Sequence, residues 1–184
     1  MSAEEMQIVS GILQNILGND NESRKQSEQQ LTKIRNEQPD QYCTLLTVIL
    51  KERAAYSLDQ RALSAVLLRR NFTVEIDSPN NLWSNISPET REHLQAAYLE
   101  LLQEETERVQ MHKVCDLISE VGGSLNVIEK KIWGSLLTVV FQYVTSEVEL
   151  HIEAALKIYN GSSSTSRTRC SSTSRSCCRS STRR

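Results

Sequence analysis

Residues 87–121 read SPETREHLQAAYLELLQEETERVQMHKVCDLISEV and predict two helices that pack as a hairpin. The first helix should begin at Pro88, because Ser87 is a favourable N-cap and proline is favourable in the first helical turn. Apolar residues then recur every three or four positions in both halves, a spacing that places them on one side of a helix. The two stripes are Leu94, Tyr98, Leu101 and Leu102, and then Met111, Val114, Cys115, Ile118 and Val121.

The same periodicity recurs along most of residues 1–160 and predicts eight helices in all. They cover about residues 6–17, 23–36, 39–50, 58–70, 88–102, 107–121, 127–145 and 147–159, with Ser23 as the cap of the second. The loop 71–85 is too polar and irregular for a regular element, and Gly122-Gly123 should end the sixth helix. The seventh helix is apolar on most sides, so we expect it to be the most buried.

The second helix of each pair carries a similar short segment, which indicates a repeat. These segments start at Arg24, Arg61, Met111 and Ile152, and the starts are 37, 50 and 41 residues apart. Their mean spacing falls within the roughly 40–47 residues typical of HEAT and armadillo repeats. The sequence therefore predicts an all-α superhelix, a solenoid of about four HEAT-type helical hairpins, which is an architecture of protein-binding scaffolds.

A sharp change of composition at Gly161 divides the chain. Six of the 21 basic residues lie after it, which leaves 15 basic against 23 acidic residues in 1–160 and a net charge of −8 there. Residues 161–184 contain no aliphatic side chain, so we expect a disordered tail rich in Ser, Thr, Arg and Cys. We predict a repeat domain over 1–160, and a changed reading frame or alternative splicing near codon 160 as the origin of the tail.

No arrangement of side chains favours an enzyme, a metal site or a cofactor. His93, His112 and His151 lie on separate hairpins, and no glycine-rich phosphate loop follows a strand. Cys115 is close to His112, but it belongs to an apolar stripe, where burial keeps a thiol unreactive. The tail cysteines, spaced C-x6-C-C from Cys170, match no tetrahedral zinc pattern.

Neither secretion nor membrane insertion is indicated. The N-terminus lacks the basic start and unbroken apolar stretch of a signal peptide. The longest apolar run is about 13 residues, too short to cross a bilayer. Cys43 and Cys115 both lie in apolar stripes and are expected to be reduced core residues of a cytosolic protein.

Charged residues on successive second helices predict a face that binds a partner. In a solenoid these helices line one continuous surface, usually the concave one. A row of both charge signs suits a polar protein partner, and the acidic repeat domain argues against nucleic acid as its ligand. The candidate residues are Arg24, Lys25, Glu28, Arg69, Arg70, Lys113, Asp116 and Glu120.

Four segments, in repeat order, resemble the N-terminal HEAT repeats of importin-β (karyopherin-β) nuclear transport receptors, especially the importin-5-like branch. They are NESRKQSE at 21–28, SAVLLRR at 64–70, KVCD at 113–116 and EAAL at 153–156. The resemblance covers about residues 5–160. Met111 and Ile152 depart from it, because the family usually has a basic residue at these positions, and everything after Asn160 leaves the pattern.

The resemblance implies a receptor that shuttles between cytoplasm and nucleus and binds the small GTPase Ran, in its GTP-bound form, through the eight charged residues. Basic protein cargo and FG nucleoporins would bind mainly to repeats further along a full-length parent, and weakly or not at all here. Two alternatives stay open. One is a general HEAT scaffold unrelated to Ran, of the phosphatase-scaffold or tubulin-binding type, and the other is an RNA-associated adaptor that uses the Arg/Ser tail.

Overall fold

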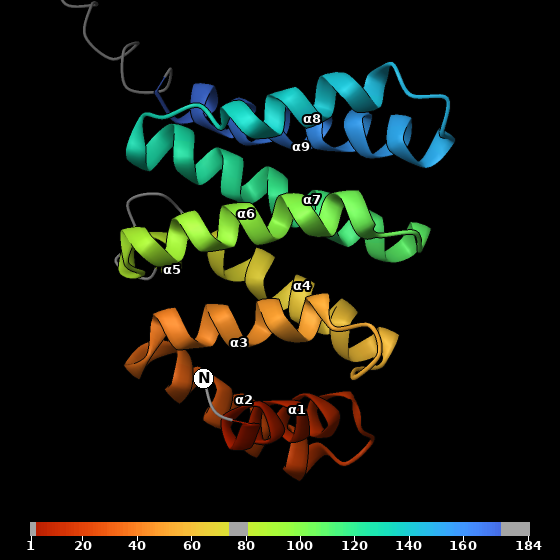
Figure 1. The fold of residues 1–184 in the computed structure, drawn as a ribbon. Helices are drawn as coiled ribbons and strands as arrows, with labels where there is room; N and C mark the ends of the chain where they lie inside the picture. Colours follow the sequence, from red (N-terminus) through yellow and green to blue (C-terminus); the bar gives the residue numbers. More distant parts are fainter. Residues whose placement is uncertain (1–2, 74–80, 174–184) are drawn as a thin grey trace, which may run out of the picture.

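The computed structural model describes residues 3–73 and 81–173, with side chains described as far as Gly161. Eight long helices of the described residues pair in chain order into four hairpins, which stack one on the next (Figure 1). The pairs are α1 (Ala3–Leu17) with α2 (Asn21–Glu37), α3 (Pro39–Lys51) with α4 (Leu58–Phe72), α6 (Pro88–Glu104) with α7 (Arg108–Ser124), and α8 (Gly134–Val144) with α9 (Glu149–Thr173). The prediction of an all-α solenoid of four helical hairpins is confirmed.

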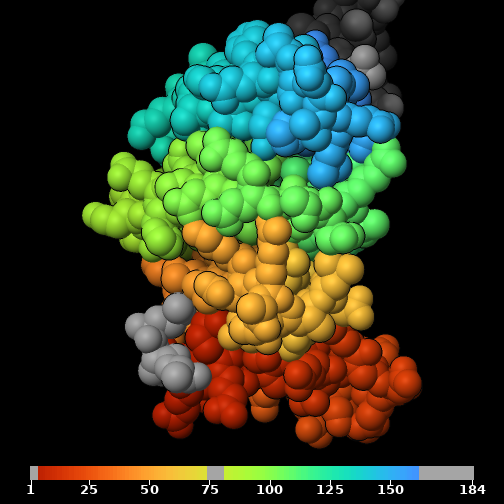
Figure 2. All heavy atoms as spheres, turned by 45° about the vertical axis from the view of Figure 1, so that its right-hand side comes forward, coloured from red at the N-terminus to blue at the C-terminus, as the bar shows by residue number. Residues whose placement is uncertain are grey.

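The helices form two layers along the stack. The first helices of the hairpins, α1, α3, α6 and α8, make the first-helix layer, and α2, α4, α7 and α9 make the second-helix layer. Helix α7 contacts both α4 and α9, so the second-helix layer is continuous across the last three hairpins. With all heavy atoms drawn, the molecule is a column of hairpins in direct contact, from α1 and α2 at the bottom to α8 and α9 at the top (Figure 2).

Side-chain caps define where the helices begin. The Ser87 hydroxyl accepts a hydrogen bond from the Thr90 amide at 3.2 Å, and Pro88 lies in the first turn of α6, as predicted. The predicted cap Ser23 is wrong. Asp20 caps α2 instead by accepting a hydrogen bond from the Ser23 amide at 3.1 Å, because a carboxylate is also favourable at the positive end of the helix dipole.

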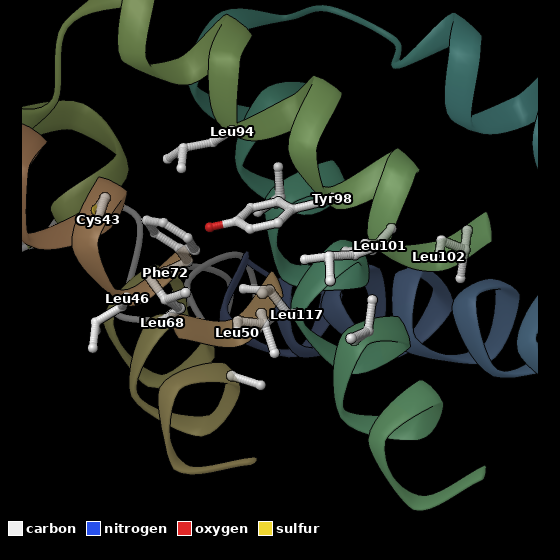
Figure 3. Close-up of a cluster of buried hydrophobic side chains, with 14 of the residues drawn as sticks. Cys43, Leu46, Leu50, Leu68, Phe72, Leu94, Tyr98, Leu101, Leu102 and Leu117 are labelled. Atoms are coloured by element: carbon white, nitrogen blue, oxygen red, sulfur yellow. The ribbon is translucent and has the colours of Figure 1, made fainter. Parts of the chain in front are cut away.

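An apolar core runs between the layers, with side chains from α3, α4, α6 and α7 meeting in one cluster (Figure 3). Tyr98 of α6 is fully buried there, and its hydroxyl is satisfied by a 3.2 Å hydrogen bond with Thr47 of α3. Leu50, Leu68 and Leu101 are also almost completely buried. Because burying one such side chain contributes about 1.5–3 kcal/mol, contact between hairpins is the main source of stability.

The predicted loop 71–85 contains a short helix, α5 (Leu82–Asn85), so the expectation of an irregular segment is wrong in its last part. Trp83 is fully buried and packs edge-on against Phe72, with ring centroids 5.4 Å apart. The Trp83 indole nitrogen donates to the Glu129 carboxylate at 2.9 Å. Glu129 lies 46 positions after Trp83, so local sequence pattern does not reveal this hydrogen-bond partner. Residues 74–80 lie outside the described residues.

Helix α7 passes through Gly122-Gly123 and ends at Ser124, so the predicted stop is wrong. A π-helical turn (Leu125–Glu129) follows, Lys130 adopts a left-handed φ of 56°, and α8 starts only at Gly134. Glycine in a helix interior costs about 1 kcal/mol relative to alanine, and the packing of α7 between α4 and α9 offsets that cost. The sequence predicts that the next helix begins at Val127, but residues 130–133 form an irregular connector. Glu129, just before this connector, is fixed by its contacts with Trp83 and Arg91.

The expectation that the seventh helix is the most buried is wrong. Leu136, Val139 and Tyr143 of α8 are buried, but Leu137, Phe141 and six other large apolar side chains from 132 to 159 are exposed. Their exposure follows from position, because the fourth hairpin has a neighbour on one side only among the described residues. No described helix is long and apolar enough to cross a membrane.

Helix α9 differs from its prediction in register and length. Ala154, Ala155 and Ile158 form its buried side, whereas Ile152 and Tyr159 of the predicted stripe are exposed. Its backbone stays helical to Thr173, across the composition change at Gly161, where the sequence predicts disorder. Extending an existing helix needs no new nucleus, so it costs little even for a Ser/Thr/Arg segment. Residues 174–184 lie outside the described residues, and the domain division at 160 stays a prediction.

A buried ion pair joins the second hairpin to the third. Arg61 of α4 and Glu105, which follows α6, form a salt bridge with side chains only 5% and 1% exposed. The Arg61 Nε also donates to the Leu50 carbonyl at 2.9 Å. Glu105 also accepts hydrogen bonds from the Thr106 and Glu107 amides at 3.0 and 3.1 Å. These additional bonds offset the cost of removing two charges from water.

Replacing Glu105 by alanine should lower the free energy of unfolding by about 3–5 kcal/mol, because Arg61 would remain buried without its counter-charge. Urea denaturation followed by circular dichroism measures the change. Arg108→Ala, which removes a largely exposed partner of Glu153, is the control and should barely move the midpoint. Arg61→Met combined with Glu105→Gln should recover part of the loss, and a double variant as unstable as Glu105→Ala contradicts this explanation.

Candidate protein-binding face

The eight predicted residues all lie in the second-helix layer, on three successive helices. Helix α2 carries Arg24, Lys25 and Glu28, α4 carries Arg69 and Arg70, and α7 carries Lys113, Asp116 and Glu120. Four of them, Lys25, Glu28, Arg69 and Arg70, are exposed, and the other four are half-buried. The residues on α4 and α7 come together directly, whereas those on α2 lie one hairpin away. We call this set the charged face.

A network of four charged residues crosses the charged face from α4 to α9. Arg69 of α4 approaches two acids of α7, with its nitrogens 3.4 Å from Asp116 Oδ2 and 3.9 Å from Glu120 Oε1. On the other side, the Nζ of Lys157 from α9 lies 2.9 Å from Asp116 Oδ1. Asp116 is thus held between cations of the two neighbouring hairpins. Single exposed pairs contribute little, but a shared network restricts these side chains together.

Glu120 is the least solvated acid of this network. Burial raises the pKa of its carboxyl group above the ordinary value of 4.5. A hydrogen bond with Thr73 and the positive charge of Arg69 oppose this rise, and the neighbouring charge of Asp116 adds to it. Burial therefore makes the ionised form of Glu120 less favourable in the folded protein.

The rest of the charged face is available to a partner. Lys25, Glu28, Arg70 and Lys113 form no ion pair within the described part of the chain. Arg24 differs, because its guanidinium donates to the Gly18 carbonyl at 2.8 Å and is held against its own hairpin. Three cations and one anion thus remain unpaired, so a partner surface that presents carboxylates fits this face best.

Sequence reasoning missed two residues of this layer. Lys157 stands five positions after Ile152, and Asp116 stands five positions after Met111, so aligning the repeat segments would have placed them opposite each other. Arg35 of α2 donates to Asn71 of α4 at 3.0 Å and links the first two hairpins. No sequence signal marks that contact, because it joins residues 36 positions apart.

The remaining reactive side chains are dispersed. His112 lies 3.4 Å from Glu153, His151 stacks on Tyr143 with centroids 4.2 Å apart, and within the described residues no cluster of His, Cys, Asp and Glu could hold a metal ion. Cys43 and Cys115 are free and buried, as predicted. Burial raises the pKa of the Cys115 thiol to about 12 and raises that of Cys43 as well, so neither thiol is nucleophilic at neutral pH.

The fold is shared with nuclear transport receptors. One structure of Kap95p with RanGDP matches with a TM-score of 0.73 and 24% identity, over 88% of this chain and 19% of that chain. Yeast importin-β (Kap95p) matches with a TM-score of 0.70 and 24% identity, over 88% and 19% of the two chains. Kap121p bound to RanGTP matches with a TM-score of 0.64 and 23% identity, over 89% and 15%. No protein-family model and no curated protein matches the sequence.

These similarities show that the chain has the HEAT-repeat solenoid fold of the importin-β karyopherins. The chain spans about a fifth or less of the length of the structures it matches. Kap95p and Kap121p match it at nearly the same identity, so the importin-5-like branch stays a prediction.

Replacing Glu120 by glutamine should stabilise the protein more at pH 7 than at pH 4. A raised pKa means that the folded protein binds the carboxyl proton more tightly than the unfolded chain does. The resulting stabilisation is complete below about 4.5 and is lost as the pH rises through the higher folded pKa. The gain in free energy of unfolding of Glu120→Gln over the unmutated protein should therefore grow across this window.

Urea denaturation at pH values from 4 to 7 measures that gain. Glu92→Gln, on the exposed side of α6, is the matched control for removing one surface carboxylate. A gain for Glu120→Gln that is the same at every pH contradicts the assignment.

Proposed function

We propose that this chain is the N-terminal repeat array of a karyopherin-type nuclear transport receptor and that its charged face binds Ran in the GTP-bound form. The single observation that supports this most is the match of nearly the whole repeat domain to karyopherins, two of them in structures with Ran. The predicted Ran-facing residues lie on three successive helices of one layer, which suits a partner that spans several repeats.

Two sets of residues in the second-helix layer would have different roles in binding Ran. The unpaired Lys25, Arg70 and Lys113 would contact carboxylates of the partner. The paired network of Arg69, Asp116, Glu120 and Lys157 would position the helices instead, because its charges are already neutralised within the chain. The available positive charge would also speed association with an acidic partner and make it weaken with added salt.

The other predicted properties follow from the same proposal. As part of a transport receptor the chain would act in nucleocytoplasmic protein transport and move between cytoplasm and nucleus. Related structures contain a nucleoporin, Nup1 with Kap95p or Nup53p with Kap121p, and one contains Pho4p with Kap121p. We propose FG nucleoporins and basic cargo as partners of a longer parent, with most of their binding sites beyond the repeats present here.

Biolayer interferometry of the chain with Ran, loaded with GTP or with GDP, tests the proposal. The GTP-bound form should bind more tightly, and binding should weaken with rising salt. Lys113→Ala and Arg70→Ala should each weaken binding about 3- to 10-fold, the effect of losing one charged contact of roughly 1 kcal/mol. Lys51→Ala, a lysine of similar exposure in the first-helix layer, is the matched control and should change affinity less than about twofold.

Equal binding of the two nucleotide forms, or none, contradicts the Ran proposal and favours a general HEAT scaffold. GTP-dependent binding that Lys51→Ala weakens as much as Lys113→Ala would retain Ran as the partner but contradict the charged face. Circular dichroism of each variant separates loss of contact from loss of fold.

A further inference from the structure

The turn between α8 and α9 presents a serine followed by exposed acidic residues. It connects the two helices at the right-hand end of the uppermost hairpin in Figure 1. Ser146 is half-buried, and Glu147, Val148 and Glu149 after it are exposed. The hydrogen bonds of this turn are local: the Ser146 amide donates to the Tyr143 carbonyl and the Val148 amide to Ser146 Oγ, both at 3.2 Å. An enzyme can therefore reach the turn without opening the core.

Ser146 differs from the other hydroxyl residues in its sequence neighbours. No other serine or threonine of the sequence has an acidic residue both one and three positions later, as Ser146 has in Glu147 and Glu149. Ser2 has an acidic residue three positions later, Glu5, but Ser2 lies outside the described residues. Carboxylates at these positions suit an acidophilic protein kinase, whose substrate groove is basic, because complementary charges fix the register in which a segment binds.

The side chains around Ser146 can also hold a phosphate. The Nδ1 of His151 lies 3.0 Å from Ser146 Oγ. Arg108 of α7 reaches the same turn, with its guanidinium 3.6 Å from Glu149 Oε1. A phosphoserine carries a charge of about −1.5 to −2 at pH 7 and accepts strong hydrogen bonds from such donors. These two residues oppose the repulsion that a phosphate meets from Glu147 and Glu149.

We propose that Ser146 is a phosphorylation site for an acidophilic protein kinase. In the reaction, the Ser146 hydroxyl oxygen bonds to the γ-phosphorus of ATP, the bond from that phosphorus to the bridging β–γ oxygen breaks, and ADP leaves. The hydroxyl proton passes to the catalytic base of the kinase. The phosphate then accepts a hydrogen bond from His151 in place of the hydroxyl contact.

The phosphate restricts the fourth hairpin through His151. The imidazole ring of His151 stacks on Tyr143 with centroids 4.2 Å apart, and the Tyr143 hydroxyl donates to the Leu102 carbonyl of α6 at 2.8 Å. A ring held by the phosphate keeps Tyr143 on the third hairpin, so opening of the fourth hairpin becomes less frequent. The site is independent of Ran binding, because the charged face lies on α2, α4 and α7.

Incubation of the chain with casein kinase 2, Mg²⁺ and ATP, followed by mass spectrometry, tests the proposal. Phosphate should appear on Ser146, and the mapped peptides separate this residue from Ser2. Glu149→Gln should slow incorporation at Ser146 at least about tenfold, the effect of losing one charge-assisted contact with the kinase. Glu153→Gln, one turn further along α9, is the matched control and should change the rate less than about twofold.

Hydrogen exchange measures the effect on the hairpin. The amides of residues 143–152 should exchange more slowly in the phosphorylated chain than in the unmodified chain, and His151→Ala should accept phosphate but lose this slowing. Absence of phosphate from Ser146, or equal rates for Glu149→Gln and the unmutated chain, overturns the site. Equal exchange with and without phosphate overturns the effect on the fourth hairpin. Circular dichroism shows whether each variant keeps its fold.

Discussion

No hairpin of this protein can cover its own apolar side chains, and the remainder of the structure follows from that constraint. Tyr98 and Leu50 come from different hairpins yet are buried in one cluster. The apolar contacts supply most of the stability because they scale with the area removed from water. Polar contacts between hairpins, such as Thr47 with Tyr98, satisfy groups that the packing has buried and so select one register of the stack.

Local sequence pattern predicted the elements that depend on local chemistry. Ser87 and Pro88 marked the start of α6, and the spacing of apolar residues marked each of the eight long helices. The pattern failed where distant residues decide the outcome. Trp83 folds into α5 because Phe72 and Glu129 lie around it, and α7 continues through its glycines because it is packed on two sides.

In the candidate site too, sequence pattern predicts some features and not those that depend on distant residues. The repeat spacing was enough to place eight charged residues on the second helices, since the face of a repeat protein follows from the order of its repeats. Which of them pair with one another was not predictable, because Arg69 and Asp116 are 47 residues apart and meet only after the hairpins stack. Arg69, Asp116 and Glu120 are neutralised by ion pairs within the chain, whereas Lys25, Arg70 and Lys113 form no ion pair among the described residues.

A stack of hairpins behaves mechanically as a spring whose segments differ in stiffness. The junction between the second and third hairpins contains the buried pair of Arg61 and Glu105. The first junction is bridged by hydrogen bonds of 3.0 Å from Gln60 to Ser10 and from Arg35 to Asn71. The last is bridged by the ion pairs of Arg108 with Glu153 and Lys157 with Asp116, and by a buried hydrogen bond of 2.8 Å from the Tyr143 hydroxyl to the Leu102 carbonyl. Under bending or torsion, elastic deformation should therefore concentrate at the first junction, because α4 packs closely on α7 and α7 on α9, whereas α2 packs on α4 much less. The curvature of the array, and with it the span of surface offered to a partner, would then be adjusted mainly by movement of the first hairpin.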